Sequence, residues 1–295
     1  MARERIGHVS LHLRARPEPV NTTPARQPDL ELRLMLAVTR RLPPIRGAGV
    51  LSCRLRRLYN RRARQPVHSR LRVAGFDFEL DLDPGEDVDG NLLFHPQLYD
   101  CHELAFLKAH LPKGGTFVDV GANIGLYSLV AARQVGPAGR VVAIEADPDT
   151  HRTLATNCTS NALHQVRARC IGVSDRDETL RFAVNTSGNR GGSSFHHEAE
   201  ARGVYLPCLP LQTILEEEGI QQIDAMKCDI EGFEYRVLKP FLANAPRTLW
   251  PRALVIESFG ASHQSAHADP VQLLREHGYR LLRRVKQNHL MTFAR

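Results

Sequence analysis

The sequence contains no run of about 18 consecutive apolar residues, the length that a membrane-spanning helix requires. We therefore predict no membrane span. The N-terminal stretch carries charges but no apolar segment long enough for a secretory signal, although its arginine content is similar to that of organelle transit peptides. These absences favour a cytoplasmic protein. A length of 295 residues with 42% hydrophobic content is enough for one large α/β domain with an appendage.

Cysteine is present but never in a close pair, and no histidine accompanies a cysteine at zinc spacing. The six cysteines lie at residues 53, 101, 158, 170, 208 and 228. This pattern excludes a disulfide framework and a structural zinc site. His263 and His267 are four residues apart, but the polar residues around them predict a loop rather than a helix with two ligands on one face. We therefore predict no metal site.

Lysine is absent from residues 1–70, which hold 16 arginines and 4 acidic residues. Because the whole chain has a net charge of +7, this excess of +12 leaves residues 71–295 with a balance of −5. An arginine-rich arm can bind nucleic acid or an acidic membrane surface. Since Tyr59 is its only aromatic residue, a solvated extension, partly disordered and with short helices over 30–42 and 50–64, is favoured. We assign this extension to residues 1–65 and the catalytic domain to residues 66–295.

Strand-like and helix-like segments alternate through the catalytic domain. Strands are expected over 116–120, 140–145, 166–173, 224–230 and 253–258, and helices over 124–134, from 148, over 233–243 and over 268–278. A hairpin over 69–83 precedes them, and 279–285 with 289–294 can close the sheet as an antiparallel pair. The alternation predicts an α/β fold with a doubly wound, mostly parallel sheet and helices on both faces.

The first of these strands ends in an unusual turn, "FVDVGANIG", at residues 117–125. Gly121 and Gly125 lack the Cβ atoms that would block a ligand, and Asn123 tolerates the dihedrals of a tight turn. Asp119 at the strand end could accept a hydrogen bond from an ammonium group. A P-loop motif is absent, and glycines do not stand at the offsets of a dinucleotide fingerprint, so phosphate binding is disfavoured.

Glu145 ends the second strand, where an acidic side chain can bind the two hydroxyls of a ribose. A cationic ligand beside the glycine turn and a ribose beside Glu145, without pyrophosphate, together describe S-adenosylmethionine. Simple packing of the turn and solvation of Glu145 are the alternatives.

The sequence "DIEG" places Asp229 and Glu231 two residues apart at the end of a later strand. Methyl transfer requires the acceptor atom to be held in line, at about 3 Å from the methyl carbon. A hydroxyl acceptor also benefits from a carboxylate that orients it and takes its proton. Asp229 and Glu231 are the candidates, with helix capping as the alternative role of Glu231. Glu257 and His263 are weaker candidates for the same step.

Five segments resemble the FkbM family of S-adenosylmethionine-dependent methyltransferases in order and approximate spacing. They are "FVDVGANIGLYSLVAA", "VVAIEADPDTHRTLATN", "GVSD", "GGSS" and "MKCDIEGFEYRVLK", and the similarity covers roughly residues 92–290. The resemblance implies a Rossmann-like class I methyltransferase fold and O-methylation of hydroxyls on sugars or other small molecules. It also implies that Gly121, Asn123, Gly125 and Glu145 hold the cofactor, with Ser174 and Asp175 near the adenine. Where the family usually has a Tyr-Glu pair, this chain has Tyr99-Asp100.

Three functions remain open at this point. The first is O-methylation of a sugar or other small-molecule hydroxyl, and the second is RNA methylation that uses the basic arm. The acidic balance after residue 70 disfavours a nucleic-acid substrate. The third is a binding module that retains the fold without activity, which the intact glycine turn, Glu145 and "DIEG" disfavour. The identity of the acceptor depends on the loops 185–207 and 258–269, whose shapes composition does not determine.

Overall fold

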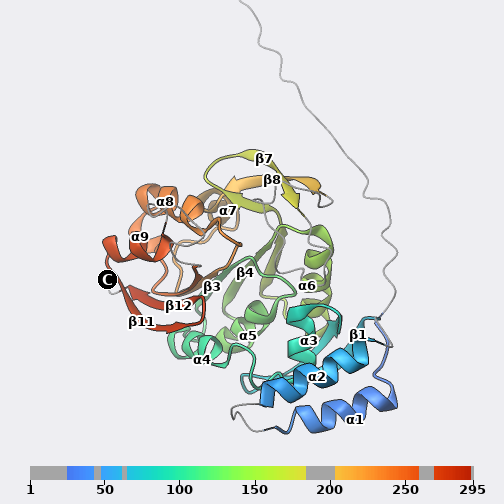
Figure 1. Cartoon of the computed structure of the whole chain (residues 1–295). Coiled ribbons are helices and arrows are strands. Elements are labelled where there is room, and N and C mark those ends of the chain that lie inside the picture. The colour runs from blue at the N-terminus through green and yellow to red at the C-terminus, as the bar shows by residue number, and fades with distance from the viewer. Residues whose placement is uncertain (1–24, 43–47, 62–64, 184–202, 259–268, 294–295) are drawn as a thin grey trace, which may run out of the picture.

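A seven-stranded sheet forms the centre of the molecule, as the computed structural model shows (Figure 1). The structure describes residues 25–42, 48–61, 65–183, 203–258 and 269–293. The strand order is β11-β12-β10-β9-β3-β4-β5. These strands are β3 (Thr116–Val120), β4 (Arg140–Glu145), β5 (Val166–Cys170), β9 (Ala225–Cys228), β10 (Ala253–Glu257), β11 (Tyr279–Val285) and β12 (Asn288–Phe293). All pair in parallel except β11 and β12, which confirms the predicted doubly wound sheet and its antiparallel edge.

Helices cover both faces of this sheet, because successive strand residues point to opposite sides. Phe117 and Val141 face one hydrophobic cluster, whereas Val118 and Val142 face another. The first face is covered by α4 (Cys101–His110), α5 (Leu126–Val135) and α6 (Pro148–Ser160). The second face is covered by α7 (Leu211–Glu217), α8 (Glu234–Asn244) and α9 (Pro270–Glu276), with the short 3-10 helix η2 (Arg247–Leu249) before β10.

Two helices begin at the caps that the sequence predicts. Asp147 accepts a hydrogen bond from the backbone N–H of Asp149 at the start of α6. Asp269 does the same for Val271 at the start of α9, over 2.9 Å. A proline follows each cap at the first helical position, where its missing N–H has no intrahelical partner to lose. The capping rules therefore located both helix starts correctly.

The predicted strand over 166–173 was wrong in one respect, because it is two strands in two sheets. The first part, β5, ends the central sheet, and the chain leaves it after the Ile171 N–H donates to the Glu145 carbonyl. The second part, β6 (Gly172–Ser174), joins a smaller sheet with β8 (Gly203–Pro210) and β7 (Glu178–Ala183). This change of sheet places Ile171 and Val173 at the wall of a pocket.

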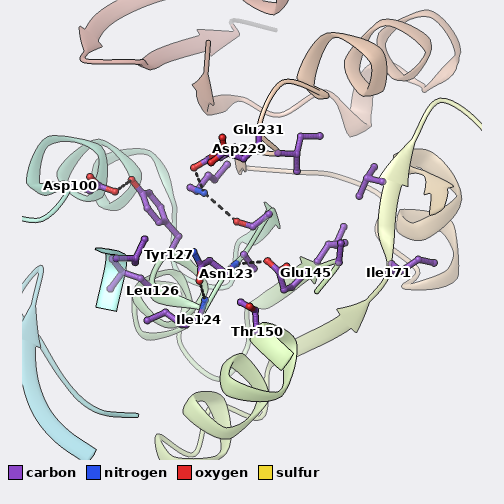
Figure 2. A pocket seen from close by; sticks show the side chains of 18 of the residues that line it. Asp100, Asn123, Ile124, Leu126, Tyr127, Glu145, Thr150, Ile171, Asp229 and Glu231 are labelled. Atoms are coloured by element: carbon purple, nitrogen blue, oxygen red, sulfur yellow. Dashed lines mark hydrogen bonds and ion pairs between the residues drawn. The ribbon is translucent and has the colours of Figure 1, made fainter. Parts of the chain in front are cut away.

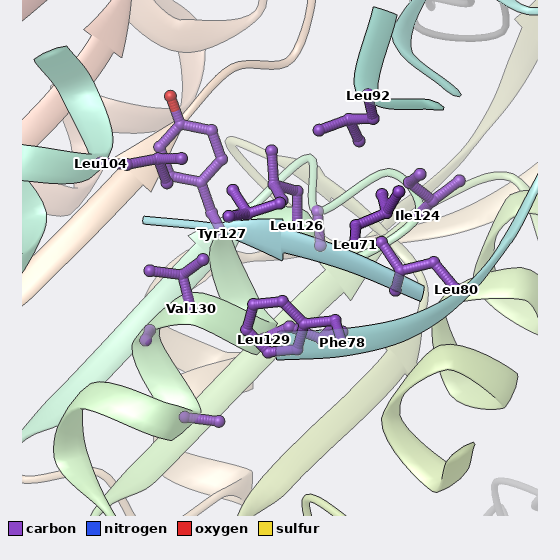
Figure 3. Close-up of a cluster of buried hydrophobic side chains, with 14 of the residues drawn as sticks. Leu71, Phe78, Leu80, Leu92, Leu104, Ile124, Leu126, Tyr127, Leu129 and Val130 are labelled. Carbon is purple, nitrogen blue, oxygen red and sulfur yellow. The ribbon is translucent and has the colours of Figure 1, made fainter. Parts of the chain in front are cut away.

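The described part of the N-terminal extension, residues 25–42 and 48–61, packs on the domain. Both predicted helices are present, as α1 (Leu30–Thr39) and α2 (Ala48–Asn60), followed by the hairpin β1 (Val67–Val73) and β2 (Phe76–Leu82) and then α3 (Asp87–Phe94). Leu32 and Tyr59 are buried in the same cluster as Leu71, Phe78 and Leu129, and Figure 3 shows the last three. The boundary near residue 66 therefore marks a change of charge and not a break in the core. Among the helices of the described residues, none is long and apolar enough to cross a bilayer.

Candidate active site

A pocket opens where β3, β4 and β9 end, at the carboxyl edge of the parallel strands (Figure 2). The ends of these strands and the segments after them supply most of its polar side chains, and the segment before α4 supplies Tyr99 and Asp100. In Figure 2, Asp229 and Glu231 lie together in one part of the pocket, and Glu145 and Thr150 lie in another. The lining residues are Val88, Tyr99, Asp100, Gly121, Ala122, Asn123, Ile124, Leu126, Tyr127, Ile144, Glu145, Ala146, Thr150, Ile171, Val173, Phe182, Lys227, Asp229, Ile230 and Glu231.

The glycine turn lies in the pocket wall, but its glycines serve the protein's own packing. A Cβ on Gly121 would stand 1.8 Å from the backbone oxygen of Asp229, and the φ of Gly121 is +78°. A Cβ on Gly125 would meet the side chains of Leu154 and Leu129, and Gly125 does not line the pocket. Gly121 lines the pocket, so its contact with a ligand stays a prediction, whereas Gly125 lies outside the lining. Gly121 allows the β3 and β9 ends to meet, and Gly125 allows α5 to start against α6.

Asn123 and Glu145 form the part of the turn that faces the pocket. Asn123 has a φ of +50°, as its turn position predicts, and its side-chain oxygen accepts from the Ile124 N–H. One carboxylate oxygen of Glu145 accepts from the Asn123 N–H over 2.8 Å, and the other accepts from the Asp147 N–H over 2.9 Å. Burial raises the pKa of Glu145 to about 7, and these two hydrogen bonds limit the rise. Each oxygen retains a second lone pair for a ligand hydroxyl.

Asp119 does not reach the pocket, contrary to its predicted contact with a ligand ammonium. Its side chain is fully buried and accepts a hydrogen bond from the Ser128 hydroxyl over 2.6 Å. Burial raises its pKa to about 6, and the nearby Lys227 ammonium opposes this rise. The cation that Asp119 faces is therefore a side chain of the protein.

Ser174 and Asp175 also lie outside the pocket lining, although the family resemblance placed them near the adenine. The Ser174 hydroxyl donates to Glu178, and Asp175 accepts from the Arg236 guanidinium over 2.7 Å. Arg236 pairs with Glu178 as well. This network joins β6, β7 and α8. The structure instead brings Ile171, Val173 and Phe182 to this side of the pocket, and they supply an apolar surface.

The buried Lys227 and the half-buried Asp229 form an ion pair at the end of β9. The Lys227 ammonium lies 2.9 Å from the Asp229 carboxylate and 3.3 Å from the Gly121 carbonyl oxygen. Burial favours a high pKa for Asp229, but Lys227 and a hydrogen bond from Glu257 hold that pKa below its usual value. Burial together with the Asp229 charge raises the pKa of Glu257. Glu257 is therefore protonated at neutral pH and donates to an ionised Asp229.

Glu231 points into the pocket and does not cap the next helix. Its φ is +52°, which is strained for a residue with a side chain, and burial raises its pKa to about 7. The neighbouring charges of Asp229 and Glu234 add to this rise. Glu234 instead stabilises the turn, because its carboxylate accepts hydrogen bonds from the backbone N–H groups of Ile230 and Gly232. The capping alternative for Glu231 was therefore wrong.

Two carboxylates of the lining, Asp229 and Glu231, and the neighbouring Glu257 come close enough to share a proton or a cation. Oxygens of Asp229, Glu231 and Glu257 all lie within 4.8 Å of one another. The Lys227 ammonium already balances the charge of Asp229, and the proton on Glu257 removes another charge. We therefore interpret the group as a proton-sharing cluster, and the expectation of no metal site stays a prediction.

Sequence reasoning missed several residues of the site. Lys227 is 7% exposed within a strand of buried residues. A lysine within an otherwise apolar strand could have identified it as a site residue from the sequence. Tyr127 donates to Asp100 over 3.0 Å, and burial raises the pKa of Asp100 to about 6. Tyr99 and Asp100, noted only as a departure from the family pattern, both line the pocket. His263, His267 and most of the two acceptor loops lie outside the described residues.

The residues of the pocket fit S-adenosylmethionine. Four carboxylates line it, Asp100, Glu145, Asp229 and Glu231, and Lys227 is its one basic residue within the described chain. Such a lining suits a ligand with a sulfonium, an ammonium and one carboxylate, and it disfavours a pyrophosphate. Ile144, Ile171, Val173 and Phe182 offer the apolar surface that an adenine needs.

Sheet order and pocket together define a Rossmann-like nucleoside-binding protein of the class I methyltransferase type. The model of the methyltransferase FkbM domain matches residues 119–281, which is more than half of the chain. The chain therefore belongs to the FkbM methyltransferase family, and S-adenosylmethionine is its cofactor.

Curated relatives include other methyltransferases. Methyltransferase sdnD of Sordaria araneosa is 30% identical over 169 residues, which cover 47% of this chain and 63% of sdnD, less than two thirds of its length. The 31-O-demethyl-FK506 methyltransferase FkbM of Streptomyces tacrolimicus is 29% identical over 201 residues, covering 57% of this chain and 74% of that protein. Among solved structures, the 16S rRNA N2 G1207 methyltransferase of T. thermophilus has a TM-score of 0.44 at 15% identity, covering 78% of this chain and 51% of that one.

Proposed function

We propose that this methyltransferase modifies a hydroxyl oxygen of a sugar or another small natural-product acceptor. The observation that supports this most is the cluster of Asp229, Glu231 and Glu257 at the ends of β9 and β10, where a proton can be accepted. A hydroxyl is a weak nucleophile that must lose its proton during transfer, and a positioned carboxylate assists that loss. One relative, the 31-O-demethyl-FK506 methyltransferase of Streptomyces tacrolimicus, is also named for an O-demethyl substrate.

In this proposal, the parts of the pocket hold different parts of the cofactor. Glu145 accepts hydrogen bonds from the ribose hydroxyls while it retains its contacts with Asn123 and Asp147. Lys227, the basic residue of the lining, faces the ligand carboxylate. The apolar side chains around Ile171 contact the adenine. S-adenosylmethionine supplies an electrophilic methyl carbon, whose bond to sulfur breaks, with its electron pair left on sulfur, as the bond to the acceptor oxygen forms.

The two catalytic carboxylates then have different tasks. Asp229 is ionised and fixed by Lys227, so it accepts a hydrogen bond from the acceptor hydroxyl and orients it. Glu231, with a pKa of about 7, takes the hydroxyl proton as the new C–O bond forms. A base whose pKa lies near neutral is matched to this step, whereas an Asp229 of low pKa is a poor base.

A nucleic-acid acceptor fits less well. The four carboxylates of the lining would repel a phosphate backbone, and the charge balance after residue 70 is −5.

The test is a screen of sugar and polyketide hydroxyl acceptors with methyl-labelled S-adenosylmethionine, read by product mass. The expected result is one methyl group on oxygen for at least one hydroxyl acceptor. The control is the Glu231→Gln variant, which should bind cofactor by calorimetry but form far less product. Methylation of nitrogen or carbon, or of RNA in place of every small hydroxyl acceptor, would reject the proposal.

A further inference from the structure

Exposed apolar side chains are concentrated on the two N-terminal helices. Single exposed apolar residues are common on protein surfaces and need no explanation, whereas a contiguous group marks an interaction site. Among the described residues, six of the nine large apolar side chains with high exposure lie on α1 and α2. They are Leu30, Leu34, Val38, Val50, Leu51 and Leu58.

Helix α1 is apolar on two opposite faces. Leu32 and Leu36 point inward and are buried in the core. Leu30, Leu34 and Val38 recur every four residues, so they form a stripe on the outer face, where they are 73%, 62% and 53% exposed. The core accounts for the inner face only, and the outer stripe has no partner within the described residues.

Helix α2 combines apolar and basic residues on its outer face. Val50, Leu51 and Leu58 are exposed, and helical spacing places Arg54 and Arg57 between them. The helix packs against α1, and both pack on α3. Figure 1 shows α1 and α2 side by side at the edge of the molecule, so that their outer faces turn away from the domain.

The charged side chains of these two helices are mostly basic. Five exposed arginines accompany the six apolar side chains, and none of them forms an ion pair within the described residues. The two helices contain a single acidic residue, Glu31. The arginines are Arg33, Arg41, Arg54, Arg57 and Arg61.

We propose that the outer faces of α1 and α2 form a docking surface for an anionic lipid bilayer. A lipid surface suits both kinds of side chain. Its anionic headgroups pair with arginine, and leucine and valine insert at the boundary between headgroups and acyl chains. The helices are 10 and 13 residues long, too short to span a bilayer, so they lie on the membrane. This surface is separate from the pocket and does not depend on the proposed acceptor.

Two other occupants explain less of the pattern. A second copy of the chain in a symmetric contact would bring these arginines against the same arginines, which is repulsive. An RNA strand would pair with arginine but needs aromatic side chains on which bases stack, and Tyr59 is buried at 3% exposure. Exposed leucine and valine gain nothing from a phosphate backbone.

The first experiment is vesicle flotation with the full chain. The probes are vesicles of phosphatidylcholine alone and of phosphatidylcholine with phosphatidylserine. The expected result is binding to the anionic vesicles only, decreasing as salt is raised. Failure to bind, or equal binding to both vesicle types, would overturn the proposal.

Paired variants assign the binding to these faces. Arg54→Gln with Arg57→Gln should weaken anionic-vesicle binding by about fivefold for each arginine. Leu34→Gln with Leu58→Gln should weaken it as well, because apolar insertion is lost. The matched control is Arg280→Gln with Leu282→Gln, which changes the same residue types at exposed positions of β11. All variants should bind S-adenosylmethionine with the parent affinity.

Three outcomes would favour another explanation and reject this one. The control pair could reduce vesicle binding as much as the α1 and α2 variants. The parent could be a dimer by light scattering that Leu34→Gln with Leu58→Gln dissociates, which would assign the face to a second copy. A single-stranded RNA could bind more tightly than the anionic vesicles and lose that binding in the arginine variant.

Discussion

At the scale of single residues, the chemistry of the site depends on one lysine, which lowers the pKa of some neighbouring carboxylates more than that of others. Lys227 faces Asp119 on the adjacent strand and Asp229 two residues on, and burial alone would lower the pKa of this ammonium. The carboxylates outweigh burial and raise its pKa, so it remains charged. Asp229 is kept ionised as a result, and Glu231 is left without a cation of its own. The two neighbouring carboxylates therefore differ in pKa and suit different roles.

The pH dependence of turnover tests this difference in pKa and role between Asp229 and Glu231. Because Glu231 has a pKa of about 7, its basic form appears as the pH rises through that value, and turnover at saturating substrates should rise between pH 6 and pH 8. Glu231→Gln should abolish this rise and lower turnover by about 10² to 10⁴. Asp229→Asn should lower turnover but keep a pH rise, with its midpoint moved to lower pH because a neighbouring negative charge is gone. An unchanged profile in Glu231→Gln would show that another group is the base.

Removal of divalent metal tests the same cluster. Since the Lys227 ammonium supplies positive charge beside Asp229, turnover should be unchanged after dialysis against a chelator. Loss of turnover that magnesium or another divalent cation restores would show that the three carboxylates bind a metal ion. The measurement is turnover before and after dialysis, with cofactor affinity followed by calorimetry in both samples.

The proposed role of Glu145 in binding the ribose can be tested with a variant that preserves the shape of its side chain. Glu145→Gln keeps one of the two acceptors and loses the negative charge, so binding of S-adenosylmethionine should weaken by about 1.5 to 3 kcal/mol. Calorimetry gives the affinity, and a thermal melt reports whether the turn around Asn123 remains folded. The control is Asp175→Asn, which lies outside the pocket lining and should leave affinity unchanged. Equal affinities for parent and Glu145→Gln would reject the ribose assignment.

At the scale of elements, the sequence predicted what local patterns determine and missed what depends on contacts between distant segments. The strands around Phe117 and Val141 and the caps at Asp147 and Asp269 follow from apolar runs and capping rules. Two features depend on a partner far along the chain, and the single strand predicted over 166–173 was wrong for this reason. The chain leaves the sheet near Ile171 to pair with β8, and Gly121 is required by the backbone of Asp229. Neither partner can be read from the residues nearby.

The contact between Gly121 and Asp229 gives a prediction about the β3 and β9 ends. Gly121→Ala would place a methyl group 1.8 Å from a backbone oxygen at a φ of +78°, so it should destabilise the fold by about 3 kcal/mol or more. Gly114→Ala is the matched control, because Gly114 has a φ of +71° with no atom within 4 Å. It should cost only the strain of the dihedral, about 1 kcal/mol. Chemical denaturation measures both, and equal losses would show that the clash relaxes without cost.

At the scale of the whole molecule, stability is tied to pH through carboxyl groups that burial keeps protonated. Glu145, Glu231 and Glu234 have pKa values raised to about 7, and Asp100 and Asp119 have pKa values raised to about 6. The folded state therefore binds more protons than the unfolded chain between the ordinary carboxyl pKa and these raised values. Two histidines with lowered pKa values, His95 and His289, act in the opposite sense. Glu257, whose pKa is raised further, acts in the same sense as the five, so six groups against two give a net loss of stability as pH rises.

The free energy of unfolding should accordingly be larger at pH 5.5 than at pH 8, in the absence of cofactor. For a group whose folded pKa is raised, stability is fully present below the unfolded pKa and is lost as the pH rises through the folded value. Glu234, fully buried with a pKa of about 7, should alone account for a loss of about 2 kcal/mol between pH 5.5 and pH 8. Glu234→Gln imitates the protonated form and cannot ionise, so its stability should depend less on pH than that of the parent. Urea denaturation of both proteins at the two pH values makes the comparison, with Glu276→Gln as an exposed control that keeps the parent slope. A parent that is more stable at pH 8 would show that these carboxyl groups ionise freely in the folded state.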